Sequence, residues 1–146
     1  MARYVASVDT DWPREEAFEY LADFAAISDW DPSVTGARRL TEDPLAVGAR
    51  FEVDFTMLGR GLPLIYETTE IEAPLRVTLR AETPTAVSVD TMTFDLKPGG
   101  GTIVTYDADV GLKGAMRAFE LPFRLHFRRL GDRARDGLRR RLSQPR

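Results

Sequence analysis

Apolar and polar residues alternate along the middle of this chain, and after residue 113 the alternation gives way to a helical spacing. The segments "ARFEVDFTM" (49–57), "LRVTLRAE" (75–82) and "TIVTYDADV" (102–110) each place apolar residues on one face of a strand. Further on, apolar residues recur at steps of three or four: Met116, Phe119, Phe123, Phe127, Leu130, Ala134, Leu138 and Leu142. This order predicts a sheet followed by one long helix, which Pro122 should kink or restart.

The connections between the strands are short and turn-like. They are "LGRG" (58–61), "EAP" (72–74), "ETP" (82–84) and "KPGGG" (97–101). Parallel strands need crossovers of a dozen residues or more, so these connections predict antiparallel pairing. The strands 62–72 and 85–96 carry apolar residues on both faces, so their facing is left open.

The N-terminal segment predicts a strand, a helix and a short helical turn. "RYVASVDT" (3–10) alternates as a strand does, and a helix follows with Pro13 in its first turn and Thr10 or Asp11 as its cap. A second helical turn is expected over residues 24–28. Trp30 then lies between two aspartates in what is expected to be a loop.

These elements predict an α+β fold in which a curved antiparallel sheet of six to seven strands wraps around the long C-terminal helix. One helix cannot cover a flat sheet of that width, whereas a curved sheet can enclose it. Space between the concave face and the helix would form a small-molecule cavity, with Trp30 expected near its mouth. The 146 residues fit one domain, residues 1–146.

Composition excludes several classes of protein. The chain has no cysteine and a single histidine, so disulfides, thiolate nucleophiles and a zinc site are not expected. No stretch has the length and apolar character of a signal peptide or a membrane span, which favours a cytoplasmic protein. Residues 124–146 hold nine arginines and two aspartates, a charge of +7. The remainder carries −10, because the whole chain carries −3. That acidic remainder argues against nucleic acid as a partner.

The chain resembles the START-like, or helix-grip, superfamily, and within it the SRPBCC branch of polyketide cyclases/dehydrases and lipid-transport proteins. The segments that carry the resemblance span nearly the whole chain: "VDTDWPREEAFEYLADFAAISDWDP", "LAVGARFEVDF", "EIEAPLRVTLRAE", "GGGTIVTYDADV" and "RRLGDRARDGLRRRL". The resemblance implies a helix-grip fold with two short helices after the first strand. It also implies that polar side chains in the cavity could steer the folding of a polyketide chain.

Strand facing and helical spacing nominate the residues that would contact a ligand. They are Trp30, Phe55, Tyr66, Met92, Tyr106, Phe119, Phe123 and Phe127. Facing supports Phe55 and Tyr106 best, because Tyr66 and Met92 lie on the two-sided strands. A tyrosine that points inward needs a partner for its hydroxyl, which is a protein group, a water or a ligand.

No catalytic set stands out in the sequence. His126 lies beside the apolar stripe of the long helix, and the sequence names no partner that would orient it for acid–base work. The carboxylates at 29/31, 107/109 and 67/70/72 are expected to face solvent. We expect no metal and no cofactor.

Three functions remain open. The first is the binding and transport of a small hydrophobic molecule, such as a lipid, a polyketide or an aromatic compound. The second is a cyclase, aromatase or dehydratase that uses the tyrosines of the cavity. The third is a protein that binds a partner through its basic C-terminal helix. The oligomeric state, monomer or homodimer, is not determined by the sequence.

Overall fold

The computed structural model describes residues 1–57 and 59–146. Its elements, in chain order, are β1 (Ala2–Thr10), α1 (Arg14–Ala22), the 3-10 turn η1 (Phe24–Ala26), α2 (Ile27–Trp30), β2 (Val34–Arg39), β3 (Arg50–Met57), β4 (Arg60–Glu72), β5 (Arg76–Glu82), β6 (Ala86–Leu96), β7 (Thr102–Leu112), the 3-10 turn η2 (Gly114–Phe119) and α3 (Glu120–Leu142). The predicted turn at 58–61 includes Leu58, which lies outside the described residues.

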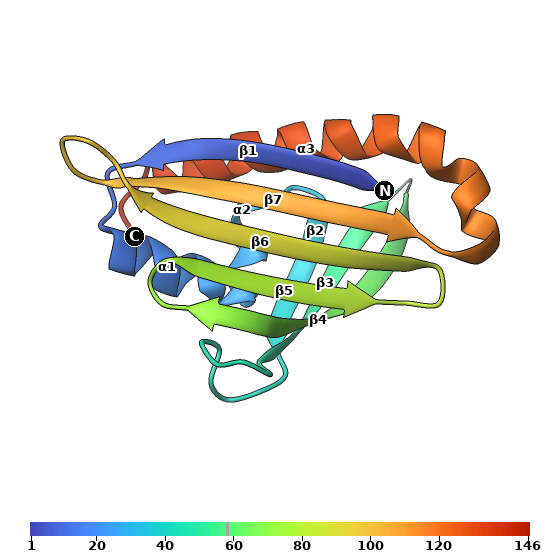
Figure 1. The fold of residues 1–146 in the computed structure, drawn as a ribbon, viewed down its shortest axis with the longest axis horizontal. Helices are drawn as coiled ribbons and strands as arrows, with labels where there is room; N and C mark the ends of the chain where they lie inside the picture. The colour runs from blue at the N-terminus through green and yellow to red at the C-terminus, as the bar shows by residue number, and fades with distance from the viewer. Residues whose placement is uncertain (58) are drawn as a thin grey trace.

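The seven strands form one antiparallel sheet in the order β1-β7-β6-β5-β4-β3-β2 (Figure 1). Strands β1 and β2 follow one another in the chain, apart from the helical segments, yet they occupy opposite edges. The sheet curls into a half-barrel, and α3 runs along its length beside β1 (Figure 1). The predicted α+β architecture, with a curved sheet around a long C-terminal helix, is confirmed.

One end of the sheet is closed by a dense core, which we call the packed end. Helix α1 and the chain's C-terminus lie at this end, and η2 lies at the other (Figure 1). Edge-to-face aromatic pairs fill the packed end: the Phe18 and Phe94 rings lie 5.3 Å apart, and those of Phe24 and Tyr66 lie 4.9 Å apart. Leu138, in the last turns of α3, is 1% exposed there.

Helix α3 approaches α2 closely at the packed end, and a glycine permits the approach. A Cβ on Gly137 would lie 1.8 Å from the Trp30 carbonyl oxygen, so no larger residue fits without backbone movement. The Thr10 hydroxyl donates to the carbonyl of Leu142 at 2.7 Å and ties the end of α3 to β1. The packed end therefore fixes how α3 lies across the sheet.

Three local expectations differ from the structure. Trp30 is the last residue of α2 and not part of a loop. Pro13 occupies the N-cap of α1, and among the described residues no side chain caps that helix. Thr10 and Asp11 lie before the N-cap, and the Thr10 hydroxyl accepts from the Trp12 amide at 3.2 Å and not from an amide of α1.

Strand β2 has no clear counterpart in the alternation pattern, because its register against β3 shifts between Val34 and Gly36. Pro122 lies in the first turn of α3, directly after η2, which confirms a restart of the helix. Among the described residues, no helix is both long enough and apolar enough to cross a membrane.

Candidate functional site

A cavity of about 770 Å³ lies between the concave face of the sheet and α3. Its volume is within the range of small-molecule sites, roughly 300–1,000 Å³. Alternate residues of β1 and of β3 to β7 form one wall, and α3, η2 and α2 form the other. Most of the lining side chains are apolar. The alternation along each strand therefore supplies the wall, because every second residue points to the concave face.

Seven of the eight residues nominated from the sequence line this cavity: Trp30, Phe55, Tyr66, Tyr106, Phe119, Phe123 and Phe127. Met92, the eighth, does not line the cavity. Met92 is fully buried in the hydrophobic core on the inner face of β6, the strand on which α1 packs. Inward facing alone therefore does not place a residue at the cavity.

Trp30 closes the inner end of the cavity. Its side chain belongs both to the hydrophobic core and to the cavity wall, and it is only 4% exposed. The indole packs edge-on against the Tyr106 ring, with 5.5 Å between centroids. Burial of this side chain agrees with the expectation, but its position near the mouth does not. Exposed lining residues mark the open side instead, including Met116 and Phe119 of η2 and Leu62 of β4.

The polar groups of the inner wall are centred on Asp90, which sequence analysis missed. The Tyr106 hydroxyl donates to Asp90 Oδ2, and the Ser88 hydroxyl donates to Asp90 Oδ1 at 3.1 Å. The Tyr66 hydroxyl lies 3.0 Å from Ser88 Oγ. All four residues line the cavity. The sequence does contain a signal for Asp90, because Ser88, Asp90, Met92 and Phe94 alternate along β6 and share its inward face. The outward residues of that strand are also partly apolar, so alternation alone does not identify the inward face.

Burial raises the pKa of Asp90 to about 6, against the opposing effect of the hydrogen bonds that it accepts from Tyr106 and Ser88. Burial also raises the pKa values of Tyr66 and Tyr106 well above the ordinary tyrosine value, so both phenols are protonated at neutral pH. The carboxyl group of Asp90 thus titrates closer to neutrality than an exposed aspartate does.

Asp31 is a second carboxylate of the wall, and the expectation that it faces solvent is wrong. It is 8% exposed, directly after Trp30, and burial raises its pKa. The backbone amide and the hydroxyl of Ser33 donate to Asp31 Oδ1 at 2.9 and 2.7 Å. The turn after α2 carries Asp31 inward, which alternation could not indicate because the residue lies between a helix and a strand.

On the helix side, two polar residues line the cavity. His126 is only partly exposed, and its Nε2 atom is buried without a hydrogen-bond partner among the described residues. The guanidinium group of Arg135 is engaged with Asp132 and Asp136, at 3.5 and 3.1 Å. Within residues 1–57 and 59–146, no cluster of three or more His, Cys, Asp or Glu side chains could hold a metal ion.

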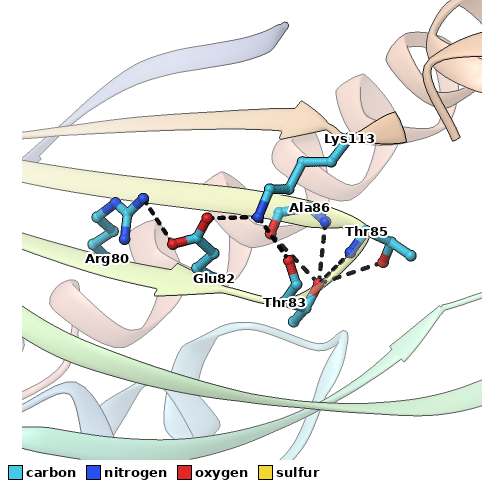
Figure 2. A network of polar contacts seen from close by, with 6 residues as sticks. All are labelled: Arg80, Glu82, Thr83, Thr85, Ala86 and Lys113. Carbon is cyan, nitrogen blue, oxygen red and sulfur yellow. Dashed lines mark hydrogen bonds and ion pairs between the residues drawn. The ribbon is translucent and has the colours of Figure 1, made fainter. Parts of the chain in front are cut away.

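A polar network holds the segment that leads to the cavity mouth, as Figure 2 shows. Lys113, the residue before η2, donates from Nζ to Glu82 Oε2 at 2.5 Å and to the Thr83 carbonyl at 3.1 Å. Its backbone amide donates to the Thr85 carbonyl at 2.7 Å. These contacts tie the end of β7 to the β5–β6 hairpin, so they fix where η2 begins. Thr83 and Thr85 also line the cavity.

Solved structures with the same fold come from several organisms. The Thermus thermophilus protein TTHA0849 is 14% identical, with a TM-score of 0.76 over 97% of this chain and 95% of that one. The Zhui aromatase/cyclase from a Streptomyces species is 14% identical, with a TM-score of 0.75 over 96% and 90%. A START superfamily protein from Mycobacterium smegmatis is 14% identical, with a TM-score of 0.70 over 97% of each chain. At these identities the similarity shows the fold alone.

A comparison with curated proteins found no match. The sequence model of one family, described as "Polyketide cyclase / dehydrase and lipid transport", matches residues 1–143. The match covers the whole sheet, α3 and every residue of the cavity wall named above. This chain therefore belongs to the polyketide cyclase/dehydrase and lipid-transport family.

Proposed function

We propose that this protein binds a small hydrophobic molecule in the cavity between the sheet and α3. The observation that carries the proposal is the cavity itself, which has about 770 Å³ of space and a predominantly apolar wall. Burial of apolar ligand surface contributes roughly 25 cal/mol per Å², which is ample for micromolar affinity before ordering costs are subtracted. Family membership supports the proposal at the level of the fold.

Access from the open side supports the same function. Phe119 is 58% exposed although it lines the cavity, and Met116, a second lining residue of η2, is 39% exposed. Large apolar side chains at an opening provide a low-cost path for an apolar ligand, because the ligand exchanges one apolar contact for another. Phe123 and Phe127, whose rings stack with 5.6 Å between centroids, form the wall just inside.

A titration of the purified protein with a fluorescent fatty acid and with a polycyclic aromatic compound tests this proposal. Phe123→Trp adds volume to the wall and should weaken binding at least several-fold. Leu125→Trp is the matched control, because this residue is 65% exposed on the same helix and does not line the cavity. Equal affinities for both variants, or no binding by the wild type, would refute the proposal. Native mass spectrometry of protein from cells would reveal a retained ligand.

A second function, catalysis of cyclisation or dehydration, is favoured by Asp90. Its carboxyl group lines the cavity with a pKa raised to about 6 by burial, so it can take up and release a proton near neutral pH. The Tyr106 phenol contacts it directly and could position a carbonyl oxygen of a substrate. The fold that this chain shares with the Zhui aromatase/cyclase is consistent with such a role.

Loss of water from a β-hydroxy ketone, followed by mass spectrometry, separates catalysis from binding alone. If Asp90 is the acid–base group, Asp90→Asn should abolish turnover and leave binding of an apolar probe nearly unchanged. Asp95→Asn, the same change at an exposed position of β6, should keep both. Absence of turnover by the wild type, with binding retained, would leave the carrier function alone.

A further inference from the structure

The hydroxyl groups around Asp90 donate to its carboxylate, either directly or through Ser88. Ser88 has one hydroxyl proton, which it donates to Asp90 Oδ1, since a carboxylate is a stronger acceptor than a phenol. The contact between Tyr66 and Ser88 therefore has Tyr66 as its donor. Tyr106 donates to Asp90 Oδ2. The three protons of this cluster are thus used internally, and only oxygen lone pairs are left for a ligand.

The second carboxylate of the wall, Asp31, also presents hydrogen-bond acceptors and no donors. Both Ser33 donors are directed at Asp31 Oδ1, so this pair also presents acceptors to the cavity. Arg135 is the one cationic side chain among the described lining residues, and Asp132 and Asp136 already neutralise it. The inner cavity therefore has two carboxylates and no cation that is free to balance an anionic ligand.

We propose that the ligand atom that reaches Asp90 is an uncharged hydroxyl donor, so the site selects hydrophobic phenols or alcohols and rejects carboxylates. This inference rests on the proposed binding function. A hydroxyl supplies the proton that the cluster lacks, whereas an ether leaves buried acceptors unpaired, at a cost in affinity. A carboxylate brings a negative charge beside the buried carboxyl groups of Asp90 and Asp31. Other polar atoms of the ligand can contact Trp30 or His126 elsewhere on the wall.

Three probes with one ring system isolate the polar group: 1-hydroxypyrene, 1-methoxypyrene and 1-pyrenecarboxylate. The wild type is titrated by fluorescence at pH 7.5, which is roughly one unit or more above the pKa of Asp90. It should bind hydroxypyrene about 10-fold or more tightly than either of the other two probes. Methoxypyrene or pyrenecarboxylate binding as tightly as hydroxypyrene would overturn the inference and leave the binding function intact. If none of the three binds, the binding function itself fails.

Asp90→Asn reverses the polarity of the site, because the amide adds two donor protons and removes the charge. The preference for hydroxypyrene over pyrenecarboxylate should then fall at least several-fold. Asp95→Asn is the matched control, since it makes the same change on β6 at an exposed position and should keep the wild-type ranking. An unchanged preference in a folded Asp90→Asn protein would overturn the inference.

Tyr106→Phe provides a second variant that needs no change at the carboxylate. It removes the proton that Asp90 Oδ2 accepts, so an acceptor position becomes available to a ligand hydroxyl. The preference for hydroxypyrene over methoxypyrene should rise, and a preference that stays level or falls would contradict the proposed donor role. Circular dichroism of each variant confirms that the protein measured is folded.

Discussion

The two halves of α3 share one apolar spacing but meet different surroundings. In the C-terminal half, Leu138 and Leu142 are each 1% exposed, and the residue before Leu138 touches the backbone of α2. In the N-terminal half no side chain is fully buried: Leu121 is 70% exposed, and Phe123 faces empty space. The C-terminal end therefore fixes the helix to the packed end, while the N-terminal half forms part of the cavity wall near the mouth.

This contrast separates stability from function along one helix. Close packing at the packed end provides dispersion contacts on all sides of a side chain, and a side chain at a void loses those contacts on one side. Substitutions at the packed end should therefore act on folding, and substitutions at the open end should act on ligand binding. Each prediction below tests one pair of positions across this divide.

The largest effect is expected from Leu142→Ala compared with Phe123→Ala. Leu142 is 1% exposed and does not line the cavity, so its truncation should lower the free energy of unfolding by about 2–5 kcal/mol. Phe123 already borders the cavity, so its truncation should cost less than half as much and should change probe affinity. Urea denaturation of both variants measures the difference, and equal losses would show that the open end is packed as tightly as the other.

Gly137→Ala and Gly131→Ala form the next pair. A Cβ at Gly137 meets the Trp30 carbonyl at 1.8 Å, and a backbone atom can move only with α2, so about 2–3 kcal/mol should be lost. A Cβ at Gly131 meets the Tyr4 ring at 2.5 Å, and this ring borders the cavity, so it can move only by giving up the hydrogen bond from its hydroxyl to Asp132. The gain of about 1 kcal/mol in helix propensity should offset part of that cost.

Thermal unfolding of the two alanine variants gives the comparison directly. The melting temperature should fall for both variants, and it should fall less for Gly131→Ala than for Gly137→Ala. The second variant should also bind the polycyclic probe more weakly, because the displaced ring of Tyr4 occupies cavity space. A larger stability loss at Gly131 than at Gly137 would contradict the division of α3 into two halves.

The sequence predicts the sheet and helix well because alternation and helical spacing report which side of an element is apolar. It does not report whether the apolar side meets other side chains or empty space, so Phe123 and Leu142 are indistinguishable by pattern. Strand β4 shows a second limit. Its register shifts between Thr68 and Glu70, and this bulge turns both Tyr66 and Ile71 toward the core although their spacing is odd.

The polar part of the site shows a third limit. An aspartate on a strand ordinarily faces solvent. Asp90 therefore breaks the apolar series on its face of β6, and the pattern no longer shows which face points inward. Only the pairing of β6 with β7 brings Tyr106 to this carboxylate, whereas Ser88 lies two residues before it on the same strand. Asp31 is equally hidden from pattern, since its direction depends on the turn after α2.

The pH dependence of stability should reveal Asp90. Its folded-state pKa of about 6 lies above the ordinary value of 3.8, so the folded state binds the proton more tightly. The stabilising contribution is therefore complete below about pH 4 and is lost as the pH rises through 6, by at most about 3 kcal/mol. Asp90→Asn should remove this loss and raise stability at pH 7 by about 1–2 kcal/mol.

Urea denaturation of the wild type and of Asp90→Asn at several pH values measures this contribution as a difference. The gap between the two proteins should widen between pH 4 and pH 7. Asp95→Asn is the control for the chemical change, because its side chain is exposed on the same strand. A gap that is constant with pH would mean that Asp90 titrates at an ordinary value.

The smallest effect on stability is expected at the two lysines of the chain, which lie at opposite ends of the sheet. Lys113 holds the start of η2 through Glu82 and Thr83, whereas Lys97 pairs with Asp11 at the packed end at 3.4 Å. Each ion pair is solvent-exposed, so Lys113→Met and Lys97→Met should each cost less than about 1 kcal/mol. Lys113→Met should nevertheless raise the dissociation rate of a bound probe several-fold, because the mouth segment loses its tether, and Lys97→Met should leave that rate unchanged. Stopped-flow displacement of the probe measures both rates. Equal dissociation rates for the two variants would mean that the network in Figure 2 stabilises the β5–β6 hairpin without affecting ligand exit. The aromatic side chains of η2 and α3 would then control ligand exit.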